Sequence, residues 1–209
     1  MRALVFLLLG SAAGMVGASL SAPAVPGECS SVPAGVSRCI YRSLAPSAGI
    51  VTSCHDEHTC RVGYYYGNPS DAVWFTPPSG MATLPKPEVF WLTATLAQIR
   101  FDCAHPCSVS YFFEARRHRL SEPRYAVLTV DPRRLLIAMA EDRALVVRQV
   151  FSGREVMRLQ RDWAPAQWLG DVIPALHFDP DGRLSFTWFR GTERAPVTER
   201  VSVPSVPHG

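Results

Sequence analysis

Short apolar segments alternate with turn sequences from residue 88 to the C-terminal end, and this alternation restricts the fold more than any other feature. The turns include Asp131-Pro132-Arg133, Ser152-Gly153 and Asp179-Pro180-Asp181-Gly182, which have residue types that tight turns favour. The segments span residues 89–101, 109–115, 124–130, 135–141, 144–151, 154–160, 175–178, 183–189 and 196–203. Tight turns join antiparallel neighbours, since parallel strands need a long crossover. The sequence therefore predicts a mainly β protein, built as an antiparallel meander or sandwich.

Part of this series resembles a known repeat family. Residues 124–160 contain four strand segments separated by three turns, and they resemble one blade of a β-propeller of the WD-repeat kind. Residues 175–203 resemble the start of a second blade, although the Gly-His and Trp-Asp signatures of that family are absent. A sandwich or a twisted meander shares this strand order. The expected fold is thus a meander or sandwich with propeller-like hairpins.

One segment interrupts the strands. Residues 161–174 show no alternation of apolar and polar positions, and Asp162 is a residue type that caps helices at their N-terminus. Gly170 is a residue type that ends them. We expect one short helix here, packed on the sheet through Trp163 and Trp168.

The N-terminus has the layout of a secretory signal peptide. Met1 and Arg2 precede an uncharged apolar run that reaches Leu20, and small residues allow cleavage after Ala18 or Ala24. An uncleaved anchor is the alternative, but the run only marginally reaches the ~20 apolar residues that span a bilayer. We expect a signal peptide over residues 1–24 and no stable membrane span after its removal. The expected location is the periplasm or the extracellular space.

The expected location predicts that the cysteines form disulfides. All six lie after the predicted signal peptide, and an even number in an oxidising compartment indicates disulfides. They fall into three close sequential pairs, which predicts local bridges. The expected bridges are Cys29–Cys39, Cys54–Cys60 and Cys103–Cys107.

Residues 25–87 differ in character from residues 88–209. The earlier stretch is rich in Pro, Gly, Ser and Cys, and only residues 62–67 and 72–76 have the aromatic and β-branched content of strands. We expect a loop-rich, disulfide-stapled region packed on the main antiparallel β domain of residues 88–209.

Charge and motifs exclude several function classes. The formal net charge is +3, or +2 without Arg2, which argues against a nucleic-acid binder. The nucleophile motif G-x-S-x-G and the zinc motif H-E-x-x-H are absent from the predicted mature chain, and no cofactor is expected. A hydrolase of envelope polymers would need two paired carboxyls, for which Glu114, Asp131 and Glu141 are unranked candidates. The sequence favours a binding protein over an enzyme.

A metal site is the second alternative. His55 and His58 lie three residues apart between Cys54 and Cys60, and His105 lies between Cys103 and Cys107. Three histidines could hold zinc or copper, but their spacing matches no defined ligand pattern. The sequence favours polar loops closed by disulfides.

The remaining candidates form a surface for an envelope protein or an envelope glycan. Aromatic residues near a Pro-rich stretch could contact a partner, and these are Tyr64, Tyr65, Tyr66 and Trp74. The segment from Glu114 to Arg119 is expected to continue a strand, with Arg116 on one face and Arg117 and Arg119 on the other. Its arginines could meet an anionic partner.

Overall fold

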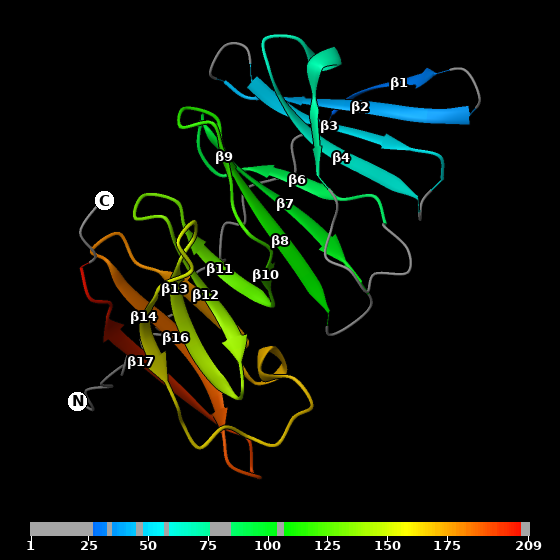
Figure 1. Ribbon diagram of the computed structural model, residues 1–209. Coiled ribbons are helices and arrows are strands. Elements are labelled where there is room, and N and C mark those ends of the chain that lie inside the picture. Colours follow the sequence, from blue (N-terminus) through cyan, green and yellow to red (C-terminus); the bar gives the residue numbers. More distant parts are fainter. Residues whose placement is uncertain are drawn as a thin grey trace, which may run out of the picture.

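The computed structural model describes residues 27–32, 35–44, 48–56, 59–75, 85–103 and 107–205, which form four antiparallel sheets (Figure 1). The prediction of a mainly β, antiparallel protein is confirmed. The predicted signal peptide lies outside the described residues. Within the described residues, no helix has the length and apolar character needed to cross a membrane.

The first sheet is a five-stranded meander in the order β1-β2-β3-β4-β5. Its strands are β1 (Glu28–Val32), β2 (Val36–Arg42), β3 (Ala48–Cys54), β4 (Cys60–Tyr66) and β5 (Val73–Phe75). The sequence predicted mainly loops here, because small residues and cysteines obscure the alternation that marks a strand. In β3, for example, six of the seven residues are buried, so the two faces do not differ in polarity. The region is a sheet with short connections.

The three predicted disulfides are present. Cys29–Cys39 joins β1 to β2 and Cys54–Cys60 joins β3 to β4, in each case between residues directly opposite in the register. Cys103–Cys107 closes the connection between two strands of the second sheet. All three bridges are local, so they fix hairpins within sheets.

The second sheet has the order β10-β8-β7-β6, with β9 also paired to β8. Its strands are β6 (Glu88–Trp91), β7 (Leu96–Asp102), β8 (Ser108–Glu114), β9 (Arg119–Leu120) and β10 (Arg124–Tyr125). The single strand predicted over residues 89–101 is in fact the hairpin of β6 and β7. The Thr93 hydroxyl accepts hydrogen bonds from the backbone N–H groups of Thr95 and Leu96, and this local bonding makes the turn.

The third and fourth sheets agree with the predicted hairpins. The third sheet has the order β11-β12-β13-β14 and the fourth the order β15-β16-β17. Their strands are β11 (Val127–Asp131), β12 (Leu136–Glu141), β13 (Ala144–Gln149), β14 (Glu155–Leu159), β15 (Ala175–Phe178), β16 (Arg183–Arg190) and β17 (Ala195–Ser202).

The sheets stack face to face in chain order, from the first to the fourth (Figure 1). Adjacent residues of β8 show this most clearly. Phe113 is buried between the first and second sheets, while Phe112 is buried between the second and third. Alternate residues of a strand point to opposite faces, so both faces of the second sheet are covered. The third sheet is likewise covered on both faces, because Ile137 contacts the second sheet and Leu136 the fourth.

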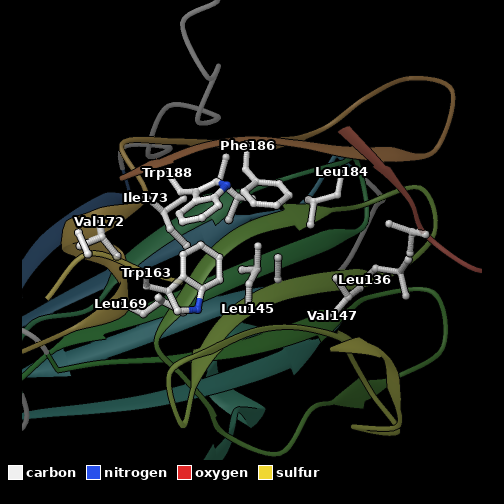
Figure 2. Close-up of a cluster of buried hydrophobic side chains, with 14 residues drawn as sticks. Leu136, Leu145, Val147, Trp163, Leu169, Val172, Ile173, Leu184, Phe186 and Trp188 are labelled. Carbon is white, nitrogen blue, oxygen red and sulfur yellow. The ribbon is translucent and has the colours of Figure 1, made fainter. Parts of the chain in front are cut away.

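The segment predicted as a helix fills the core between the third and fourth sheets. The Trp163 ring lies against Trp188 and Phe186 of β16, with Leu145 of β13 beside it (Figure 2). The segment contains only a 3₁₀ turn, Leu169–Val172, and the described residues contain no helix of seven or more residues. The predicted helix from Asp162 to Gly170 is therefore absent, and the observed turn overlaps it only at residues 169–170.

The propeller-like part of the prediction is not supported. None of the four described sheets closes or curls. The outer face of the fourth sheet is polar; for instance, the hydroxyls of Thr187 and Thr198 hydrogen-bond across β16 and β17 at 3.0 Å.

Candidate functional site: an arginine-lined rim

The aromatic residues expected to contact a partner lie on two different faces of the first sheet. Tyr64 and Tyr66 face the second sheet, where the Tyr64 ring stacks on Phe113 with centroids 5.2 Å apart. The Tyr66 ring stacks on His118 at 3.8 Å. Burial, followed by the neighbouring Tyr64, raises the pKa of Tyr66 to about 12, so it is neutral at physiological pH. These rings join the two sheets.

Tyr65 and Trp74 lie on the outer face of the first sheet. Tyr65 is only 2% exposed, and its ring lies over the backbone of Gly49. The Trp74 ring lies over Gly63, and the Arg61 guanidinium covers it at 4.7 Å from the ring centroid. Each ring therefore already has packing partners.

The predicted arginine segment is a turn instead of a strand end. β8 ends at Glu114, residues 115–118 form the turn, and His118 has a positive φ of 49°. Arg116 and Arg117 are exposed, and neither has an ion pair or a side-chain hydrogen bond among the described residues. The structure thus places two uncompensated positive charges at the tip of a hairpin.

This tip borders a small hollow that we call the arginine hollow, which has a volume of ≈ 160 Å³. Its polar lining comes from three separate hairpins, and its apolar lining is Leu135 and Phe151. The polar lining residues are Arg117, Arg119, Arg134, Gln149 and Ser152. These hairpin turns lie at one end of the strands of the second and third sheets, on the left of the view in Figure 1.

Two of the three guanidinium groups are held in fixed positions. Arg119 pairs with Glu114 at 2.9 Å and lies 3.7 Å from the centroid of the Phe151 ring. Arg134 donates from Nε to Asp131 at 2.6 Å and from Nη1 to the carbonyl oxygen of Gly182 at 2.7 Å. The Nη2 group of Arg134 is buried and has no hydrogen-bond partner among the described residues. A buried donor of this kind costs free energy unless a ligand or water accepts from it.

The turn after β13 supplies uncharged hydrogen-bonding groups. Ser152 donates to the amide oxygen of Gln149 at 2.5 Å, so the NH₂ group of Gln149 remains as its donor. Arg124 donates to the carbonyl oxygen of Val150 from Nε at 3.0 Å and from Nη2 at 2.9 Å. Burial lowers the pKa of Arg124. Arg124 therefore positions this turn and does not itself line the hollow.

A second and larger cavity, which we call the Asp-Pro groove, adjoins the hollow. It has a volume of ≈ 490 Å³ and lies between the turn that follows β11 and the turn that follows β15. Its apolar lining is Val130, Pro132, Phe178, Pro180 and Val203. Its polar lining is Asp131, Arg133, Arg134, Asp179, Asp181 and Ser205, together with the backbone of Gly182. Arg134 lines both cavities, so it separates the hollow from the groove.

The carboxylates of the groove are already compensated. Asp179 accepts hydrogen bonds from Ser185 at 2.7 Å and from Arg200 at 2.6 Å, and Asp181 pairs with Arg200 at 2.8 Å. Burial alone would raise the pKa of Asp179, but the hydrogen bonds from Ser185 and Arg200 outweigh it and lower the pKa. Arg133 has no side-chain partner among the described residues. The arginine hollow and the Asp-Pro groove together, which we call the rim, therefore present excess positive charge.

Sequence reasoning found the arginine turn but missed Arg134, Gln149 and Ser152. These three residues lie 15 or more positions after Arg119, on turns of a different sheet. No local pattern marks them. Their convergence depends on the stacking of the second sheet on the third.

The structure describes one of the three metal candidates and all three candidate acids. Of the metal candidates, His55 is exposed in a turn, while His58 and His105 lie outside the described residues. The described residues contain no group of three or more potential metal ligands. The candidate acids each pair with arginine: Glu114 with Arg119, Asp131 with Arg134, and Glu141 with Arg148 and Arg158. Glu141 also lies at the opposite end of the third sheet from Asp131.

Comparisons with protein-family models, with curated proteins and with solved structures found no match to this chain. The chemistry of the rim is therefore the basis on which a function can be inferred. Three guanidinium groups around a hollow can bind an oxyanion, because arginine forms charge-assisted hydrogen bonds with carboxylate and phosphate oxygens.

Proposed function

We propose that this chain is an exported binding protein of the bacterial envelope, and that it recognises an anionic glycan at the arginine hollow. The observation that carries this proposal is the convergence of Arg117 and Arg119 from one hairpin with Arg134 from another around one small cavity. Each of these guanidinium groups can donate hydrogen bonds to an anion. Charge-assisted hydrogen bonds of this kind are about twice as strong as neutral ones.

Export is supported by two features. The first 24 residues have the layout of a signal peptide, and disulfides form and persist in oxidising compartments. All three bridges close hairpins of the described sheets.

The surface favours a glycan over a protein partner. Stable protein interfaces commonly bury ~800 Å² on each partner, with aromatic and apolar residues at the centre. In the described residues, the exposed large hydrophobic side chains are Leu44, Val73 and Tyr125, which lie on separate elements. A small polar cavity suits a single charged substituent, such as the carboxylate or phosphate of a polysaccharide.

The test uses the exported, processed chain and three polysaccharides: one carrying phosphate, one of polygalacturonate and one of neutral dextran. We expect binding to the anionic polymers and weaker binding as salt is raised, because salt screens exposed charges. Arg117→Gln should weaken binding at least about tenfold, since a hydrogen bond to a charged group contributes ~1.5–3 kcal/mol.

Arg190→Gln is the matched control. Arg190 is an exposed arginine at the end of β16 remote from the rim, and its closest carboxylate is Asp162 at 3.9 Å. This variant should bind like the parent protein. Equal binding of dextran and the anionic polymers, or an Arg117→Gln variant with unchanged affinity, would refute the proposal.

A further inference from the structure

The hollow and the groove differ in what they can hold. Ligand-sized pockets usually enclose ~300–1,000 Å³, so the ≈ 490 Å³ groove falls in that range while the ≈ 160 Å³ hollow falls below it. The hollow therefore has room for one charged substituent. The rest of a larger ligand must bind outside the hollow. The groove is the adjoining space, because Arg134 lines both.

The lining of the groove indicates which chemical class of ligand could bind there. Pro132, Pro180 and Phe178 offer apolar surface, while Asp181, Ser205 and the unpaired Arg133 offer polar groups beside it. An acyl chain would remove these polar groups from water without giving them partners, which is unfavourable. A sugar ring has both apolar C–H faces and hydroxyl groups, so it can contact both kinds of lining.

We infer that the Asp-Pro groove is a sugar subsite, and that a single ligand places an anionic substituent in the arginine hollow and the sugar ring that bears it in the groove. This inference rests on the proposed function and specifies its ligand. Arg134 lines both parts, and Asp131 holds its Nε while the Gly182 carbonyl holds its Nη1. In this arrangement, a free anion such as inorganic phosphate occupies the hollow and leaves the groove empty.

The test compares four small probes by isothermal titration calorimetry with the exported, processed chain: inorganic phosphate, glucose, glucose 6-phosphate and glucuronate. We expect at least one anionic sugar to bind about tenfold or more tightly than inorganic phosphate, because the ring adds hydrogen bonds and buried surface in the groove. The anionic sugar that shows this gain identifies the charged substituent as phosphate or carboxylate.

Two variants separate the subsites. Ser205→Trp places a large ring in the groove at an exposed position, and we expect it to remove the gain, so that the anionic sugar and inorganic phosphate bind alike. Arg117→Gln should weaken both probes by a similar factor. Arg190→Gln, away from the rim, should keep the gain.

The outcomes distinguish the two levels of the proposal. Absence of binding by inorganic phosphate and by both anionic sugars would refute the proposed function together with this inference. Phosphate binding that depends on Arg117, without any gain for either sugar, would refute only the sugar subsite. A gain that survives Ser205→Trp would also refute it, because the ring would then lie elsewhere.

Discussion

Replacement of Phe112 by alanine tests the stacking on which the rim depends. The Phe112 ring is 0% exposed and lies between the second and third sheets, beside Ile137 and Val146. A buried aromatic side chain removes ~150–250 Å² from water, and at ~25 cal/mol per Å² this gives about 4–6 kcal/mol. Measured losses for Phe→Ala in cores are about 3–5 kcal/mol. We therefore expect Phe112→Ala to lower the free energy of unfolding by about 4 kcal/mol.

The assay is urea denaturation followed by tryptophan fluorescence. With an m-value of about 2–3 kcal/mol/M, a loss of this size lowers the urea midpoint by about 1.3–2 M while the m-value stays constant. Tyr125→Ala is the control, because Tyr125 is 50% exposed on the same sheet and should cost about 1 kcal/mol or less. A loss below about 1 kcal/mol for Phe112→Ala would contradict a closed interface between the second and third sheets.

Three further outcomes are expected. The hydrogen bond from Arg161 lowers the pKa of Glu199, so this carboxylate stabilises the fold above its unfolded pKa near 4.5 and that stability is lost as pH falls through the lower folded value. Glu199→Gln should therefore cost stability at pH 7, and a difference from the parent protein that persists undiminished at pH 3 in urea titrations would contradict this reasoning. Removal of the Cys54–Cys60 bridge by double serine substitution should lower the free energy of unfolding by about 2 kcal/mol, measured against the untreated parent chain, and an unchanged urea midpoint would argue against its contribution. Gly63→Ala should shift the tryptophan emission spectrum, because the added Cβ would lie 3.2 Å from the Trp74 indole ring and 2.9 Å from the backbone oxygen of Val73. An identical spectrum and stability would show that the Trp74 ring lies elsewhere.

The candidate site was only half accessible from the sequence. The run that contains Arg116, Arg117 and Arg119 is visible in the sequence as a cluster of charge. It could be predicted as an anion-binding surface without knowledge of the fold. Its assignment to a strand was wrong, because β8 ends at Glu114 and a turn follows. Arg134 could not be found, since an arginine after an Asp-Pro pair looks like any solvated turn residue.

The sequence by itself determined the local features of this protein. Alternation of apolar segments with tight turns decided the antiparallel hairpins, and the close spacing of the cysteines decided which of them pair. Both depend on contacts between residues near one another in the chain, for which backbone and spacing preferences suffice. Tertiary structure alone decided which sheet faces meet, and therefore that Phe112 and Phe113 enter different cores and that Arg134 and Arg117 line one cavity. Those contacts depend on the fit of whole sheet faces, which no short stretch of sequence records.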